Sequence, residues 1–155
     1  MTTNQIYSDT SSIEFDASER TLRSVLTLLN EGRFSDALDQ FDDHFTFIDH
    51  ALDLEFTNKE SLIEFFQKSR ELFPDTALEI ESAFGYGGHA TAEWKLTATQ
   101  IEPYGSLHYR SRIVLRGSTI ARVVNGRVTR WSEYYDKPTS HRYRLAGIFK
   151  EWIEL

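Results

Sequence analysis

The feature that most constrains this chain is a change of hydrophobic period near residue 76. Before that point, apolar residues recur at helical spacing in two main stretches, near 18–32 and 58–73. From 76 to 135 they alternate with polar residues, as in Ala90-Thr91-Ala92-Glu93-Trp94, which is typical of strands with one buried face. Helices that are segregated from a run of strands predict the α+β class.

Turn sequences divide the strand region. Gly87-Gly88 predicts a tight hairpin, Pro103-Tyr104-Gly105-Ser106 a longer turn, and Asn125-Gly126 a type I′ hairpin. Strands are therefore expected over 107–124 and 127–135, with Gly117 marking a bulge or a bend in the first of them.

Capping residues predict where the first two helices begin and end. Asp16, followed by Glu19, resembles the capping box that opens a helix, and Gly32 suits its end. Ser35 then caps a short second helix whose inward-facing residues include Phe41.

Two short strands and a third helix are expected next. Residues 45–50 alternate with period two, and 52–56 continue the strand pattern. Thr57 and Glu60 then form the capping box of a helix that Pro74 ends.

Composition excludes several classes of site and partner. The chain has no cysteine, which excludes disulfides, thiolate zinc sites, iron–sulfur clusters and cysteine nucleophiles. Its net charge of −7 argues against nucleic acid as a partner. No apolar run is long enough to cross a membrane, and residues 1–5 lack the features of a signal peptide, so we expect a cytoplasmic protein. The histidines are scattered and no dinucleotide or phosphate-binding glycine motif occurs, so we expect neither a metal nor a cofactor.

Several segments, taken in order and spacing, resemble SnoaL-like polyketide-cyclase domains of the nuclear transport factor 2-like superfamily. The resemblance covers about residues 18–137. The segments that carry it are Phe45-Thr46-Phe47-Ile48-Asp49-His50, Thr57-Asn58-Lys59-Glu60-Ser61-Leu62, Phe73-Pro74-Asp75, Ala92-Glu93-Trp94, and the closing hairpin Val123-Val124-Asn125-Gly126-Arg127-Val128-Thr129-Arg130-Trp131-Ser132-Glu133-Tyr134-Tyr135-Asp136.

The resemblance implies a cone-shaped (cystatin-like) roll in which N-terminal helices pack on a strongly bent antiparallel sheet around a cavity. We expect this domain over 16–137, after a loose segment 1–15 and before a helical tail 138–155. It also implies frequent homodimers and no cofactor. The superfamily includes ketosteroid isomerase, scytalone dehydratase, limonene epoxide hydrolase and many non-catalytic binding modules.

The function implied first is a cofactor-independent acid/base enzyme of the cyclase, isomerase or dehydratase type. Its substrate would be a small apolar carbonyl or polyketide-like compound. Two alternatives stay open: a non-catalytic ligand-binding or dimerisation module of the same fold, and an epoxide hydrolase, which needs an arginine between two pocket carboxylates.

Asp136 is the first candidate for proton transfer, because the acid/base carboxylate of the resembling family falls at this position. By period two it shares a face with Val128, Ser132 and Tyr134, provided that no bulge intervenes. Burial among aromatic rings would raise the pKa of its carboxyl group toward the working pH. The alternative is an Asp that caps the turn before Pro138.

Asp49 and His50 are the candidates to assist. As neighbours in a strand they point to opposite faces, so only one of them can face a cavity directly. Asp49 shares its face with Phe45 and Phe47, whereas His50 suits a proton shuttle near neutral pH. The alternative places both in a solvated turn.

Aromatic residues are the candidates for the walls of the ligand site. Trp94, Tyr109 and Tyr134 are the rings that we assign to binding, although any one ring can equally belong to the core or to an interface. Arg112 is a further binding candidate, as a partner of a pocket carboxylate. Its alternative is an outer sheet face on which long arginine stems cover apolar strands.

Overall fold

The helices lie in the N-terminal half of the chain and the long strands in the C-terminal half, as the change of period predicts. The computed structural model describes residues 15–104 and 107–136, but not the side chains of 101–109; the predicted tail 138–155 and nearly all of segment 1–15 lie outside this range. The elements are α1 (Ala17–Asn30), α2 (Phe34–Leu38), β1 (Phe41–Asp49), β2 (Leu54–Phe56), α3 (Lys59–Leu72), β3 (Ala77–Tyr86), β4 (His89–Tyr104), β5 (Leu107–Val124) and β6 (Arg127–Tyr135).

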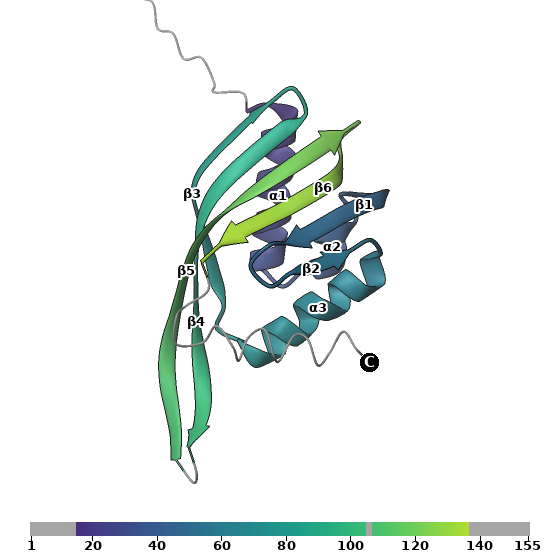
Figure 1. Ribbon diagram of the computed structural model, residues 1–155. Coiled ribbons are helices and arrows are strands. Elements are labelled where there is room, and N and C mark those ends of the chain that lie inside the picture. Colours follow the sequence, from purple (N-terminus) through teal and green to yellow (C-terminus); the bar gives the residue numbers. More distant parts are fainter. Residues whose placement is uncertain (1–14, 105–106, 137–155) are drawn as a thin grey trace, which may run out of the picture.

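One sheet with the strand order β2-β1-β6-β5-β4-β3 carries the fold. Neighbouring strands are antiparallel except for β1 and β6, which run parallel and join the N-terminal half to the meander. The long strands β4 and β5 curve along their length, and the helices pack on one face of the sheet (Figure 1). The predicted α+β class and the turns at Gly87-Gly88 and Asn125-Gly126 are confirmed.

Helix α1 begins and ends where its capping residues predict. The Asp16 side chain accepts a hydrogen bond of 2.8 Å from the Ser18 backbone N–H. After Asn30 the chain reverses at Gly32, whose φ of +75° is readily adopted only by glycine. The buried stripe that packs toward β3, β4 and β5 consists of Leu22, Val25 and Leu26.

The second helix is shorter than predicted. It ends at Leu38, and Phe41 is the first residue of β1, where it pairs with Val128 of β6. The spacing of Phe41 fits a helix face and a strand face equally well, and pairing with a distant strand decides between them. Arg33 occupies the N-cap without a side-chain bond, so the prediction that Ser35 caps this helix was wrong.

Helix α3 begins one residue later than its capping box suggests. Asn58, not Thr57, is the N-cap, and its side chain accepts a 2.8 Å hydrogen bond from the Ser61 backbone N–H. The helix ends at Leu72, two residues before Pro74, as the sequence predicts.

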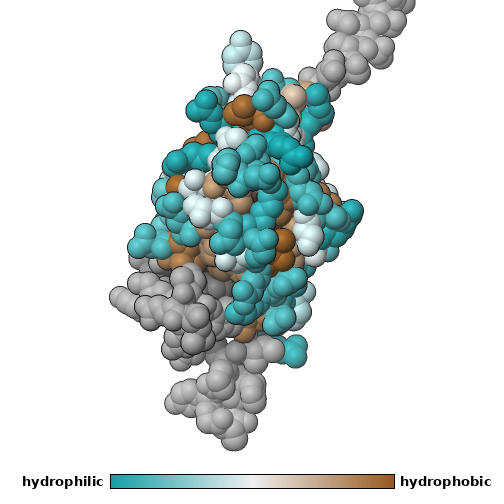
Figure 2. Space-filling view, turned by 90° about the vertical axis from the view of Figure 1, so that its right-hand side faces the viewer, coloured by the Kyte–Doolittle hydropathy of each residue, from teal (hydrophilic) through white to brown (hydrophobic). Residues whose placement is uncertain are grey.

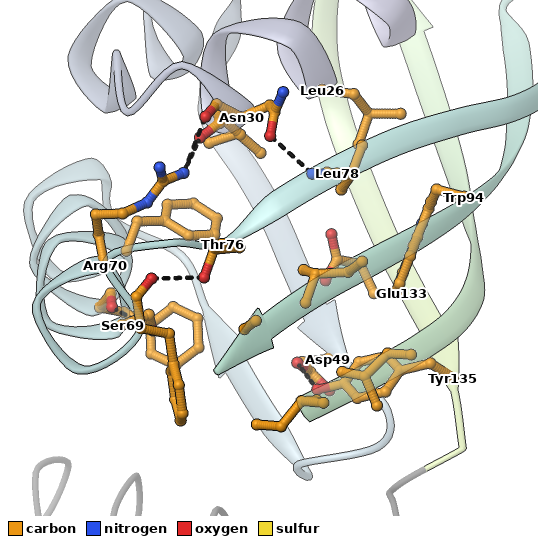
Figure 3. A pocket seen from close by; sticks show the side chains of 18 of the residues that line it. Leu26, Asn30, Asp49, Ser69, Arg70, Thr76, Leu78, Trp94, Glu133 and Tyr135 are labelled. Atoms are coloured by element: carbon orange, nitrogen blue, oxygen red, sulfur yellow. Dashed lines mark hydrogen bonds between the residues drawn. The ribbon is translucent and has the colours of Figure 1, made fainter. Parts of the chain in front are cut away.

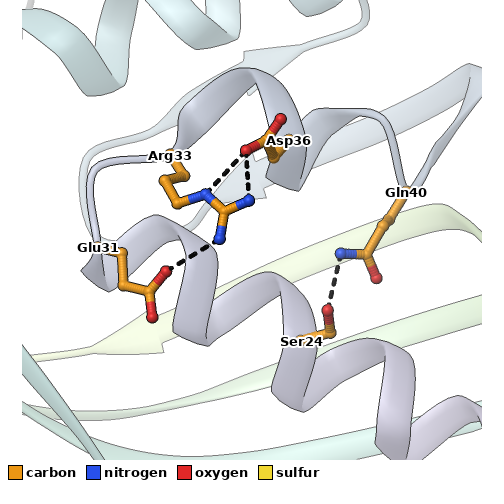
Figure 4. Close-up of polar contacts among 5 residues, drawn as sticks. All are labelled: Ser24, Glu31, Arg33, Asp36 and Gln40. Carbon is orange, nitrogen blue, oxygen red and sulfur yellow. Dashed lines mark hydrogen bonds and ion pairs between the residues drawn. The ribbon is translucent and has the colours of Figure 1, made fainter.

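Exposed polar contacts fix the turn between α1 and α2 (Figure 4). The Arg33 guanidinium lies 2.8 Å from Asp36 and 3.4 Å from Glu31, while the Gln40 amide donates to the Ser24 hydroxyl at 2.9 Å. Exposed ion pairs contribute little to stability, so these contacts orient α2 more than they stabilise it.

Gly117 does not mark a bulge, because β4 and β5 pair through Trp94 and Gly117 without a shift of register. The glycine is required by close packing instead. A Cβ atom there would lie 2.5 Å from the Tyr134 backbone oxygen and 2.7 Å from the Trp94 ring.

Large aromatic side chains form the centre of the core. Trp131, Phe41 and Phe47 are fully buried. The side of the molecule that carries β1, α2 and α3 is mostly hydrophilic, with separate apolar residues between the polar ones (Figure 2). The space between these helices and the curved sheet contains the site described next.

Candidate functional site

A cavity of about 190 Å³ lies between the helices and the sheet (Figure 3). Its walls are mostly apolar and come from α1, α3, β4 and β5, with a few polar groups among them. The apolar wall residues include Leu26, Leu29, Phe34, Phe65, Phe66, Leu78, Leu96, Ala98, Ile113 and Leu115.

Two carboxyl groups from neighbouring strands face this cavity. Asp49 is the last residue of β1, and Glu133 lies directly opposite it in the parallel pairing with β6. The backbone N–H of His50 donates to the Glu133 carbonyl oxygen at 3.1 Å, which holds the end of β1 in register. Because partners in a parallel pair point to the same face, the two acids lie side by side in the cavity wall.

Asp49 is 3% exposed and accepts hydrogen bonds on both carboxylate oxygens. The Tyr135 hydroxyl donates to Oδ2 at 2.8 Å, and the Leu52 backbone N–H donates to Oδ1 at 2.9 Å. These two hydrogen bonds stabilise the carboxylate form of Asp49, whereas its burial acts against that form.

Glu133 is held as the neutral acid. The residue keeps part of its surface exposed, but protein atoms surround the carboxyl group itself. Burial and, second, the negative charge of Asp49 raise the pKa of Glu133 to about 8, although the Trp131 indole N–H donates to its Oε1 at 2.9 Å. Burial and the neighbouring charge of Asp49 thus favour the protonated form of Glu133 at neutral pH.

Tyr135 and Trp94 complete this end of the cavity. Burial, and then the charge of Asp49, raise the pKa of the Tyr135 phenol far above its usual value, so the hydroxyl keeps its proton. Trp94 is 4% exposed, and its indole N–H donates to the Thr119 hydroxyl at 2.9 Å, which fixes the ring in the wall. Of the rings that we assigned to binding, Trp94 lies in this cavity.

Asp136, His50 and Tyr134 lie elsewhere. All three are exposed and, together with Arg116, line a separate shallow hollow. The rings of His50 and Tyr134 stack with their centroids 4.3 Å apart. Asp49 therefore faces the cavity while His50 does not, in keeping with their opposite strand faces.

Of the two remaining candidates, Arg112 does not line the cavity of the acid pair. Arg112 is exposed, while its neighbour Ile113 lines the cavity. Its positive charge contributes to the lowered pKa of Asp75, after the larger effect of hydrogen bonds from Thr99. The side chain of Tyr109 lies outside the described residues.

Period two places Asp136 on the face of Val128 provided that no bulge intervenes, but β6 contains a bulge. Arg122 pairs with Arg130, and the next residue of β5 pairs with Val128, so Thr129 is an extra residue in β6. Beyond it, Trp131, Glu133 and Tyr135 face inward. The sequence contains one sign of this bulge, because unbroken alternation from Val128 would place the charged side chain of Arg130 on the buried face.

The described residues contain neither a metal site nor a membrane-spanning helix. Within 15–104 and 107–136 no group of three or more His, Asp or Glu side chains is arranged to hold a metal ion. None of the helices described there is long and apolar enough to span a membrane.

Solved structures with the same fold share little sequence with this chain. A provisionally assigned SnoaL-like polyketide cyclase from Shewanella putrefaciens has a TM-score of 0.68 at 15% identity, over 79% of this chain and 92% of that one. AclR from Streptomyces galilaeus, a provisionally assigned hydroxylase, has a TM-score of 0.65 at 15% identity, over 80% and 81%. A nuclear transport factor 2-like protein of unknown function from Burkholderia pseudomallei has a TM-score of 0.68 at 12% identity, over 83% and 97%. The predicted nuclear transport factor 2-like fold is confirmed.

Sequence comparison identifies the family. No curated protein is significantly similar to the chain. A family model for the SnoaL-like domain matches residues 22–131, which extend from the first helix into the last strand and make up most of the chain. The chain therefore belongs to the SnoaL-like domain family, as its sequence predicts.

Proposed function

We propose that this protein is an acid/base enzyme that moves a proton on a small apolar carbonyl compound, with Asp49 and Glu133 as the working pair. The observation that carries the proposal is the pair itself: two carboxyl groups lie side by side in a mostly apolar cavity, and burial raises the pKa of one of them, Glu133, to about 8. Environments that separate the pKa values of two acids are typical of acid/base catalysis. Asp136 is exposed outside this cavity, so the proposal assigns it no proton transfer.

In the proposed reaction Asp49 is the base. It removes a proton from the carbon next to the carbonyl group, the C–H electron pair forms a C=C bond, and the carbonyl π pair moves to oxygen. Hydrogen bonds from the Tyr135 hydroxyl and the Leu52 backbone N–H hold its carboxylate in position. The Glu133 carboxyl group donates a hydrogen bond to the developing oxyanion. Return of a proton to the same carbon gives exchange; in a ketone with a β,γ C=C bond, return to the γ carbon shifts that bond and completes an isomerisation with no net oxidation.

The size of the cavity limits the substrate. An apolar cavity of about 150 Å³ in another protein takes up benzene. A cavity of about 190 Å³ suits a compound built on one or two small rings.

The test is hydrogen–deuterium exchange in D₂O, followed by NMR on acetophenone and 2-tetralone. We expect the protein to accelerate exchange of the protons next to the carbonyl group. Asp49→Asn should reduce the rate at least a hundredfold, because removal of a general base costs about 10²–10⁴-fold. Asp136→Asn is the matched control and should exchange like the parent protein. Full activity of Asp49→Asn would refute the assignment.

A non-catalytic binding module is the second candidate, and the exposure of Asp136 favours it, because the resembling family places its acid/base carboxylate there. Under this alternative both ketones bind, but their exchange stays at the buffer rate. An epoxide hydrolase needs an arginine between Asp49 and Glu133. Among the described arginines, Arg112 and Arg116 are exposed, and Arg70 lies on the helix side of the cavity.

The predicted homodimer and cytoplasmic location stay predictions. Light scattering coupled to size-exclusion chromatography tests the first. A dimer gives about twice the mass of 18.0 kDa of one chain, whereas a monomer gives that mass.

A further inference from the structure

A single guanidinium group lies in the cavity wall on the helix side. Arg70 belongs to the last turn of α3, is half-buried and lines the cavity. Among the described residues no carboxylate forms an ion pair with it. A positive charge in a mostly apolar wall is costly unless something compensates it.

Hydrogen bonds position this group against the end of α1. Nη2 of Arg70 donates to the backbone oxygens of Leu29 and Asn30, at 3.2 and 3.0 Å, at the C-terminal end of α1. The guanidinium also lies 6.0 Å from the centre of the Phe34 ring. Asn30 is itself anchored, since its Oδ1 accepts a 2.7 Å hydrogen bond from the Leu78 backbone N–H. These bonds occupy Nη2 and leave the N–H groups of Nη1 and Nε as donors.

The hydroxyl groups beside Arg70 are already committed as donors. The Ser69 hydroxyl donates to the Phe65 carbonyl oxygen at 2.8 Å, and the Thr76 hydroxyl donates to the Phe73 carbonyl oxygen at 2.7 Å. A neutral polar ligand group therefore finds little to accept from these hydroxyls, whereas an anion finds the charge and the remaining donors of Arg70.

Arg70 and the acid pair lie on opposite sides of the cavity. Figure 3 shows Arg70 and Ser69 on α3, with Asp49, Glu133 and Tyr135 on the sheet side. A ligand that contacts both ends thus meets a cation at one end and proton-transfer groups at the other, with apolar wall between them.

We propose that Arg70 is a specificity-determining residue and that the substrate is an apolar ketone with a carboxylate at the end away from its carbonyl group. The part of this inference that concerns the ketone group of the substrate rests on the proposed function. The part that concerns the carboxylate group of the substrate rests on Arg70 alone. This orientation also keeps the carboxylate of the substrate away from the negative charge of Asp49.

The experiment compares two probes of the same shape, 4-acetylbenzoate and its neutral analogue 4-acetylbenzamide. Both present a methyl ketone, and they differ in the charge at the other end. Binding to the full chain is measured by isothermal titration calorimetry at pH 7. We expect the parent protein to bind the benzoate about tenfold more tightly than the amide, since a charge-assisted hydrogen bond is roughly twice as strong as a neutral one.

Variants assign the preference to Arg70. Arg70→Gln should lose the tenfold preference and bind the amide as the parent protein does. Lys68→Gln is the matched control: it removes the same charge from the same helix, at a residue that is paired with Glu64, and should keep the preference. Equal binding of the two probes to the parent protein overturns the inference, as does weaker binding of the benzoate than of the amide. An equal loss of both probes in a folded Arg70→Gln variant also overturns it, because that result indicates a purely structural role.

A readout without a variant keeps the inference testable if Arg70→Gln does not fold. The Nε–H resonance of Arg70 should shift in the NMR spectrum on addition of the benzoate and stay in place with the amide. Deuterium exchange of the acetyl protons separates the two proposals. A charge preference without exchange refutes the proposed function alone, whereas exchange without a charge preference refutes the role of Arg70 alone.

Discussion

Glu133→Gln should make this protein more stable at neutral pH, although it removes a proposed functional group. Glutamine has the shape of protonated glutamic acid and can still accept the 2.9 Å hydrogen bond from the Trp131 indole N–H. It cannot ionise, so it avoids the burial and the repulsion by Asp49 that disfavour the Glu133 carboxylate.

The magnitude follows from the pKa of Glu133, which is about 8 in the folded protein against an ordinary value of 4.5. Below pH 4.5 both the folded and the unfolded states carry the proton, and the variant gains nothing. Between pH 4.5 and 8 the unfolded chain ionises while the folded protein does not, so the parent protein loses stability as the pH rises. The loss is about 1.4 kcal/mol per pH unit, or about 3 kcal/mol at pH 7, and it levels off above pH 8.

Urea denaturation of the parent protein and of Glu133→Gln, at intervals from pH 4 to 9, measures this difference. The free energies of unfolding should agree at pH 4 and diverge by about 3 kcal/mol at pH 7, which corresponds to roughly 6–12 °C in melting temperature. A difference that does not change with pH would refute the reasoning. So would a variant that is less stable at pH 7, because that result requires an ionised and well-paired Glu133 in the folded state.

Three further predictions concern the same wall of the cavity. Tyr135→Phe removes the hydrogen bond to Asp49 and should lower the free energy of unfolding by about 2 kcal/mol, measured by denaturation at pH 7; an unchanged stability would contradict the contact. Gly117→Ala places a Cβ atom 2.7 Å from the Trp94 ring and should cost about 1–3 kcal/mol, with a change in tryptophan fluorescence; a neutral effect would show that the close approach is absent. The rate of exchange on acetophenone should fall as the pH rises through about 8, because Glu133 then loses the proton that the reaction needs; a rate that keeps rising above pH 9 would argue against this role.

The fold could be predicted where local chemistry decides the structure. Asp16 and Gly32 mark the limits of α1, and the Asn125-Gly126 turn separates two long strands whose bounds match the expected ones. Each of these features depends on residues close together in the chain. Phe41 is different, because its place in a strand depends on pairing with β6, far away in the sequence.

The site could be predicted only in part, for a similar reason. Alternation along a strand placed Asp49 on the buried face of β1, and no bulge separates Phe45, Phe47 and Asp49. In β6 the extra residue Thr129 reverses the alternation and brings Glu133 inward. The bulge belongs to the pairing with β5, and along β6 alone its one sign is that unbroken alternation from Val128 places Arg130 on the buried face. Arg70 was missed because its position depends on contacts between two helices.

The proposed reaction requires that Asp49 and Glu133 share one proton in the cavity at neutral pH. Carbon-13 NMR of the side-chain carboxyl groups, recorded from pH 3 to 10 and assigned with Asp49→Asn and Glu133→Gln, measures it directly. We expect the Glu133 resonance to titrate with a midpoint near pH 8 and Asp49 to be ionised at neutral pH. A Glu133 midpoint at its ordinary value near 4.5, or a protonated Asp49 at pH 7, would contradict this requirement.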